Sequence, residues 1–220
     1  ATTQGDTLLN ADDVRALTVP SSLSGTAPWN GAGIRVGVIS DGADVLATSQ
    51  ATDDLPGTVT VHPTMPGSGV EGVAMMEVIY DMAPGTQLFF AGPSTAVQMD
   101  AAIQWMVYNN QVDVIVDDLY FFSEPSMDRV NGVVTPSIAA HANPNGVLYI
   151  TAAGNFAQVT YHGTFTNPGA GLAVPGIPGE YLHDFKTGVD VDQLLNFNEV
   201  PVGVQVRAYL QWDDPFGASA

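Results

Sequence analysis

The hydrophobic positions of the first 150 residues form short continuous runs that alternate with longer segments of helical spacing. Strands that are apolar throughout, rather than apolar at every second position, are typical of a parallel sheet covered by helices on both faces. We therefore predict an α/β fold with a doubly wound, mostly parallel sheet. The predicted strands are 34–39, 58–61, 86–91, 112–117 and 146–152, and the predicted helices are 9–17, 70–82, 95–108 and 130–142.

The pattern changes after about residue 157, where Gly, Pro and Thr alternate with short β-like runs such as "TYHGTF" and "VPVGVQV". This change predicts a second, β-rich module. A β module of only some 40 residues is short for an independent one, so we expect it to continue beyond residue 220. The predicted order is an N-terminal lead-in (1–30), the front part of a core domain (31–157), a linker (158–179) and an incomplete β-rich module (180–220).

Charge and composition exclude several classes of partner. The chain has 23 acidic and 5 basic residues, a net charge of −18, and no cysteine. Such a chain repels nucleic acid and anionic membrane surfaces, so we expect neither as a partner. Without cysteine there is no disulfide and no thiolate metal site. We predict no cofactor; the acidity leaves room for structural calcium, although no loop shows a ladder of calcium ligands.

Targeting signals are not visible in the sequence. No apolar run reaches the roughly 18 residues of a membrane span, and "ATTQGDTLLN" has neither a basic start nor an apolar core. We expect a secreted or extracytoplasmic protein whose signal peptide has been removed.

Candidate chemical groups collect at the predicted carboxyl ends of the strands. Asp41 follows the first strand, Asp117 and Asp118 end the fourth, and Asn155 follows the fifth. Glu71 begins the helix after the second strand. Because function in an open α/β sheet concentrates at this edge, these five side chains are the candidate site residues.

Each of these residues also has a purely local interpretation. Ser68 and Glu71 have the spacing of a capping box, in which Ser68 caps the helix and Glu71 bonds back to the Ser68 amide. Asp41 before Gly42 fits a turn, and Asn155 fits a turn position of positive φ. Taken one at a time, the residues leave these alternatives open.

Three blocks taken in order resemble the subtilisin-like serine peptidases. "GIRVGVISDG" is similar to the strand and aspartate that supply the triad Asp, which corresponds to Asp41. "EGVAMMEVIYDMAPGTQLFFA" resembles the helix that begins with the catalytic His and ends in an "APG" turn, and "AAGN" resembles the oxyanion-hole loop, which gives that role to Asn155. The resemblance covers about the first 157 residues and implies a serine endopeptidase that acts on polypeptides through an acyl-enzyme.

The chain departs from most of that family at the base. Glu71 stands where most members have His, as in the related sedolisins with their Ser-Glu-Asp set. The sedolisin Asp lies four residues along the same helix, where this chain has Met75, and Asn155 stands where sedolisins have Asp. The resemblance therefore implies Glu71 as the base, Asp41 as its orienting carboxylate and Asn155 as the oxyanion donor. Two close carboxyls would share a proton, so we expect activity at acidic pH.

The remaining roles follow from the same resemblance. We expect Asp117 and Asp118 to line the substrate cleft. The family's nucleophilic Ser precedes a late helix, and Ser219 in "FGASA" has no such helix after it. We therefore expect the nucleophile beyond residue 220, in a C-terminal continuation or a companion fragment, and we expect this chain alone to be inactive.

Two other classes of function fit part of the pattern. Asp41 with the Asp117–Asp118 pair would suit Mg²⁺ in a phosphotransferase or phosphatase. Against this, the core has no lysine near the transferred phosphate, since Lys186 is the only lysine of the chain. The third class is a non-catalytic binding module with a peptidase fold.

Overall fold

The computed structural model describes residues 4–17, 29–122, 124 and 132–155, together with the single positions 163, 164, 183, 185, 202, 203, 205 and 209. The chain divides into two compact units, one of residues 1–154 with 210–220 and one of residues 155–209. The predicted linker and the β-rich module lie almost entirely outside the described residues, as does Ser219, so those predictions stay predictions.

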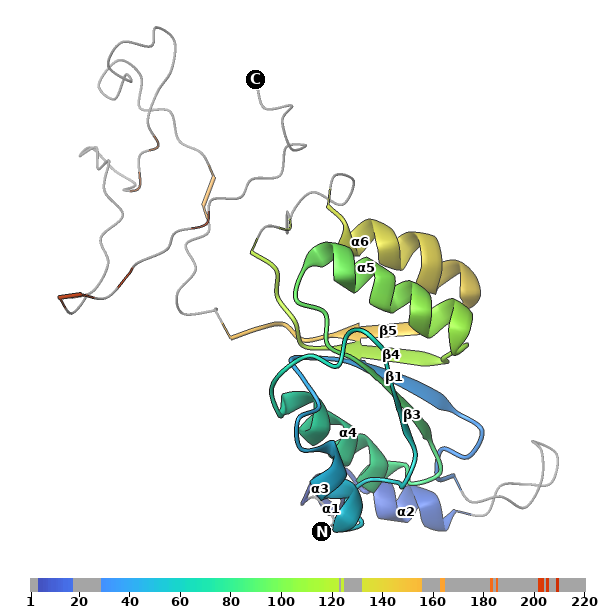
Figure 1. Ribbon diagram of the computed structural model, residues 1–220. Helices are drawn as coiled ribbons and strands as arrows, with labels where there is room; N and C mark the ends of the chain where they lie inside the picture. Colours follow the sequence, from blue (N-terminus) through green and yellow to red (C-terminus); the bar gives the residue numbers. More distant parts are fainter. Residues whose placement is uncertain are drawn as a thin grey trace, which may run out of the picture. The chain divides into compact units, whose positions relative to one another are not determined.

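A five-stranded parallel sheet forms the centre of the first unit (Figure 1). Its spatial order is β2-β3-β1-β4-β5, and every pair of neighbours runs parallel. The strands are β1 (Arg35–Ile39), β2 (Val59–Val61), β3 (Gln87–Ala91), β4 (Val114–Asp117) and β5 (Leu148–Thr151). The predicted α/β class and parallel sheet are confirmed.

Helices cover both faces of this sheet, as Figure 1 shows. One face carries α5 and α6, and the other carries the N-terminal helices with α3 and α4. The α-helices are α1 (Gln4–Leu8), α2 (Ala11–Ala16), α3 (Leu46–Ala51), α4 (Glu71–Met82), α5 (Ala96–Gln104) and α6 (Val134–Ser137). Two π-helical segments, η2 (Trp105–Asn109) and η3 (Ile138–Ala142), continue α5 and α6, and a 3₁₀ turn, η4 (Asn143–Asn145), follows η3.

The two cores follow from the alternation of side chains along the central strands. Leu88 and Phe90 of β3 pack on one face with Val73 and Met76 of α4, whereas Phe89 packs on the opposite face in the cluster of α5 and η2. Successive side chains of a strand point to opposite faces, so a strand with a helix layer on each side must be apolar at every position. This explains the continuous runs in the sequence.

The predicted elements differ from the observed ones mainly at their ends. Each strand begins one or two residues later than predicted. The predicted helix 130–142 becomes α6 with η3 and begins at Val134. The short α3 was not predicted, because "LATSQA" has few apolar residues and buries only Ser49.

The predicted N-terminal lead-in folds onto the end of α4. Arg15 in α2 donates two hydrogen bonds to the Asp6 carboxylate, of 2.6 and 2.8 Å. The same guanidinium also donates to the carbonyl oxygens of Asp81 and Met82 at the carboxyl end of α4. A cation at this position satisfies carbonyls that the helix leaves free and complements the helix dipole.

Candidate active site

The parallel register brings the ends of β1 and β4 together. Ile39 at the end of β1 pairs with Ala91 of β3 on one side and with Asp117 of β4 on the other. The segments that follow, with Asp41 and Asp118, therefore leave the sheet at the same edge. Helix α4 begins at this edge with Glu71.

Asp41 holds the first turn of α4. Its Oδ1 accepts hydrogen bonds from the backbone N–H groups of Glu71 (3.0 Å) and Gly72 (3.2 Å). Its carbonyl oxygen accepts the N–H of Ser68 at 2.8 Å. Gly69 fits beside this carboxylate only because it has no side chain: its φ is +139°, and a Cβ there would collide with Asp41 Oδ2. Asp41 thus acts as the N-terminal cap of α4 from a distant part of the chain.

The capping box expected as the local alternative for Glu71 does not form. Val70 is the N-cap residue and makes no side-chain cap. The Ser68 hydroxyl instead donates to Asp44 Oδ2 at 3.3 Å, and the Ser68 amide is bonded to Asp41. The capping-box interpretation is therefore wrong, because the Ser68 hydroxyl and the Ser68 amide are bonded to Asp44 and Asp41 instead. The carboxyl group of Glu71 is left at the edge of the sheet.

Glu71 lies next to Asp118. The side chain of Glu71 is exposed, yet its pKa is raised, first by the negative charge of Asp118. Partial burial, the charge of Asp41 and the closeness of the Asp118 carboxyl raise the pKa of Glu71 further. The start of a helix favours the ionised carboxylate, but here the two neighbouring carboxylates outweigh that effect.

Asp118 is half-buried, and its Oδ1 is buried without a hydrogen-bond partner. The strongest interaction with the Glu71 carboxyl thus comes from Asp118 rather than from Asp41. From the sequence, Asp118 was expected to line the substrate cleft. Its place beside Glu71 depends on β4 lying beside β1, which only the sheet order reveals.

Asp117 faces inward, unlike its neighbour. It is 5% exposed, and its Oδ1 accepts the Thr151 hydroxyl of β5 at 2.9 Å. The Tyr149 hydroxyl lies close to the same carboxyl, although it makes no hydrogen bond of good geometry. Burial raises the pKa of Asp117, and these polar neighbours oppose the rise. A buried side chain that joins two strands has a structural role, and this placement gives no support to substrate contact by Asp117.

Asn155 is exposed and follows β5. It belongs to the second compact unit, of residues 155–209, whose position relative to the first unit is not determined. The structure therefore does not bring Asn155 together with Glu71, and its oxyanion role stays a prediction.

His62, at the end of β2, is the histidine nearest to Glu71 in the sequence. Its ring packs edge-on against Trp105, with 4.8 Å between the ring centroids, and its Nδ1 accepts the Thr64 N–H. Burial lowers the pKa of His62. These contacts are those of a packed, neutral imidazole.

The part of the chain that the structure describes contains no group of three or more His, Cys, Asp or Glu residues arranged to hold a metal ion. Nor does this part contain a helix long and apolar enough to cross a membrane.

Comparison with known proteins gives few relatives. No family model matches the chain, and no curated protein matches it. Among solved structures, the chain is similar to the crystal structure of MycP1 with the N-terminal propeptide removed, with a TM-score of 0.38 and 18% sequence identity. The alignment covers 79% of this chain and 53% of the MycP1 chain, so this chain spans about half the length of that protein. A similarity this weak carries no argument about activity.

Proposed function

We propose that this chain is the front part of a serine endopeptidase in which Glu71 is the general base. The observation that carries the proposal is the state of Glu71. Its carboxyl is not used in a capping box and lies beside Asp118 at the carboxyl edge of a parallel sheet, and its pKa is raised. Perturbed carboxyl groups at such an edge are typical of acid–base catalysis. The subtilisin-like blocks of the sequence supply the reaction class.

Within this proposal, Glu71 accepts the proton of the nucleophilic serine and returns it to the leaving amine. An acyl-enzyme forms between these two transfers and is then hydrolysed. The side-chain amide of Asn155 donates to the oxyanion, a contribution of about 3–4 kcal/mol where such donors have been removed. The nucleophile comes from a continuation beyond residue 220 or from a companion fragment.

The two aspartates have different parts in the proposal. Asp41 fixes the backbone at Glu71, since it accepts the first N–H groups of α4. Asp118 raises the pKa of Glu71 through its negative charge. Because Glu71 must be ionised to accept the serine proton, activity falls as pH drops through the raised pKa of Glu71. The activity expected at acidic pH belongs to this proposal.

The magnesium-dependent alternative has less support. It requires Asp41 and the Asp117–Asp118 pair to converge on one ion. One oxygen of Asp41 is bonded to two N–H groups of α4, and one oxygen of Asp117 is bonded to Thr151. Among the described residues, these carboxylates are not arranged in a group that could hold a metal ion.

A serine-directed probe tests the proposal. The native preparation is exposed to a fluorophosphonate at mildly acidic pH and analysed by intact mass. We expect label on a companion fragment or continuation that purifies with this chain.

Label on Ser219 would place the nucleophile inside the chain and overturn its assignment to the continuation. An unlabelled preparation that contains the continuation would overturn the peptidase proposal, and release of phosphate only with magnesium would favour the alternative. A preparation with neither activity would be a binding module. The same proposal includes a polypeptide substrate and secretion of the protein.

A further inference from the structure

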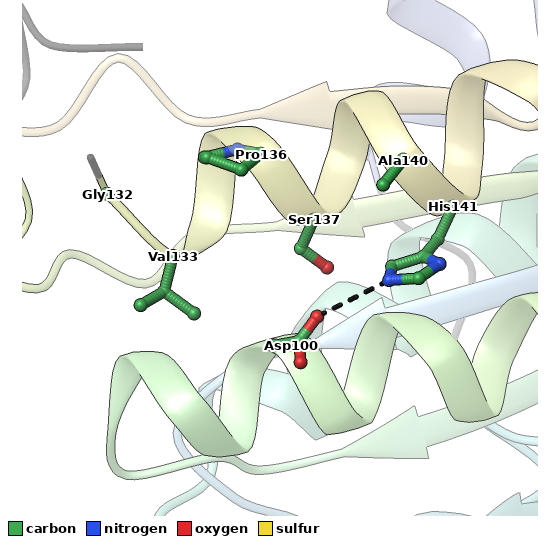
Figure 2. Close-up of a pocket in the computed structure, with 7 residues that line it drawn as sticks. All are labelled: Asp100, Gly132, Val133, Pro136, Ser137, Ala140 and His141. Atoms are coloured by element: carbon green, nitrogen blue, oxygen red, sulfur yellow. Dashed lines mark ion pairs between the residues drawn. The ribbon is translucent and has the colours of Figure 1, made fainter. Parts of the chain in front are cut away.

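An open cleft lies between α5 and α6, on one face of the sheet (Figure 2). Its volume is about 330 Å³, which is at the lower end of the range for small-molecule sites. Figure 2 shows Asp100 on α5 facing residues of α6 and η3 across this cleft. The lining residues are Asp100, Gly132, Val133, Pro136, Ser137, Ala140 and His141.

Ser137 is the unusual residue of this cleft. It is 4% exposed, and its hydroxyl oxygen is buried without a hydrogen-bond partner. Leaving a buried hydroxyl unpaired costs about 1–3 kcal/mol, so such a group indicates a partner that the protein itself does not supply. The Ser137 side chain points into the space between the two helices (Figure 2).

His141 is held from two sides and does not serve Ser137. Its Nδ1 lies 2.9 Å from the Tyr108 hydroxyl, and its Nε2 lies 3.7 Å from Asp100 Oδ1. Both ring nitrogens therefore face other groups. Ser137, His141 and Asp100 have the residue types of a catalytic triad, but the Ser137 hydroxyl makes no hydrogen bond to the imidazole, so the three side chains are not connected as a triad.

The charges around the cleft select a cation. Asp100 Oδ2 accepts one hydrogen bond from Gln104, while Oδ1 has only the long contact with His141. A second carboxylate, Glu124, bonds to the N–H groups of Val133 and Val134 at the start of α6. No Lys or Arg is among the described residues that line the cleft. An anion would be repelled here, and an apolar ligand would leave the Ser137 hydroxyl unpaired.

A primary alkylammonium group would satisfy these conditions. One N–H would donate to the Ser137 oxygen and another to Asp100, while a short alkyl chain would lie against Val133, Pro136 and Ala140. A bare metal ion fits less well, because the cleft offers only one carboxylate and one imidazole, whose Nδ1 is bonded to Tyr108. The net charge of −18 also concentrates cations near the surface.

We propose that the cleft between α5 and α6 binds a primary alkylammonium group, carried by a small amine or by a lysine side chain, between Asp100 and Ser137. This site is separate from the Glu71 edge and does not depend on the proposed peptidase activity.

NMR titration of the whole chain with n-butylammonium tests this proposal, followed through the methyl groups of Val133 and Ala140. We expect saturable shifts with a dissociation constant in the millimolar range, about what five heavy atoms can provide. Asp100→Asn should weaken binding about tenfold and Ser137→Ala about threefold to tenfold, since hydrogen bonds to charged groups are the stronger ones. Asp12→Asn removes an exposed charge of α2 and is the matched control, with binding unchanged.

Two ligand controls separate hydrogen bonding from charge and from apolar contact. Tetramethylammonium has the charge without an N–H group, and n-butanol has the alkyl chain without the charge, so both should bind at least tenfold more weakly. Equal binding of n-butanol, or equal effects of Asp100→Asn and Asp12→Asn, would overturn the proposal. If N-acetyl-lysine-methylamide binds as well as n-butylammonium, the alkylammonium group can come from a lysine side chain. If n-butylammonium binds and the capped lysine does not, the ligand is a small amine. Circular dichroism of each variant shows whether a loss of binding comes from unfolding.

Discussion

Two neighbouring regions at the carboxyl edge of the sheet contain carboxyl groups with raised pKa, and the causes differ. The pKa of Glu71 is raised mainly by the charge of Asp118, although Glu71 is exposed. The pKa of Asp117 is raised mainly by burial, and its carboxyl is bonded to Thr151. An exposed carboxyl whose pKa depends on a like charge can exchange its proton with solvent. A buried carboxyl that joins two strands stabilises the sheet instead.

The end of β4 contributes one carboxyl group to each region: Asp117 is bonded to Thr151, and Asp118 lies near Glu71. Successive residues of a strand point in opposite directions. Asp117 therefore lies on the same face of the sheet as Thr151, its register partner on β5, while Asp118, the residue after β4, lies near Glu71 at the start of α4. Similar side chains at adjacent positions thus have different surroundings.

The largest effect that we expect concerns Glu71. In a form of the protein that carries the nucleophile, Glu71→Gln should lower kcat/KM about a thousandfold, because general base catalysis contributes about 10²–10⁴-fold. Glu77→Gln on the same helix is the control, since that carboxylate accepts a bond from Ser49; its rate should stay within about twofold. A near-normal rate for Glu71→Gln would contradict the assignment of the base.

The next effect concerns stability at Asp117. Asp117→Ala should lower the free energy of unfolding by about 0.5–1.5 kcal/mol, because the hydrogen bond from the Thr151 hydroxyl to the Asp117 carboxyl is lost. Asp118→Ala should change it by about 0.5 kcal/mol or less, as expected for a residue outside the core. Urea denaturation of the isolated chain measures both. Equal losses would mean that the two carboxyls do not differ in role.

Asp117 also predicts a dependence of stability on pH. The pKa of Asp117 is raised in the folded state, so between about pH 3.9 and that raised value the folded state binds more protons than the unfolded state. The contribution of Asp117 to the free energy of unfolding therefore falls as pH rises through this window. Asp117→Asn should remove that decline, and denaturation of both forms across pH tests it.

A smaller effect concerns the cap of α4. Asp41→Ala should cost about 1 kcal/mol, because two N–H groups of the first helical turn lose their acceptor. Asp41→Asn keeps an acceptor oxygen and should lose less than half as much. A loss equal to that of the alanine variant would show that the charge, rather than the hydrogen bonds, stabilises this turn.

The smallest effect in energy concerns the pairing of Glu71 with Asp118, because Glu71 is exposed. Asp118→Asn should lower the pKa of Glu71, since it removes the first cause of the rise. Asp41→Asn should lower it less. Carbon-13 NMR of the Glu71 carboxyl in the isolated chain measures these shifts without any need for peptidase activity. If Asp41→Asn has the larger effect, then Asp41 and not Asp118 is the main partner.

Much of the fold was predictable because its signals are local. The strands β1, β3 and β4 are continuous apolar runs, and the start of α4 follows a run of small residues at 66–70. These patterns depend on neighbours in the chain. The same reasoning placed Asp41, Asp117 and Asp118 at one edge, because parallel strands bring their carboxyl ends together.

The pairings within that edge were decided by the tertiary structure. The start of α4 is capped by Asp41, which lies 30 residues before Glu71, and not by the nearby Ser68. Asp118 becomes the main neighbour of Glu71 only because β4 lies beside β1. The cleft of Asp100, Ser137 and His141 likewise requires α5 and α6 to share one face of the sheet. A hydrogen bond or a charge pair acts over a few ångströms of space, and distances between remote segments are set by the packing of the sheet and not by the local sequence.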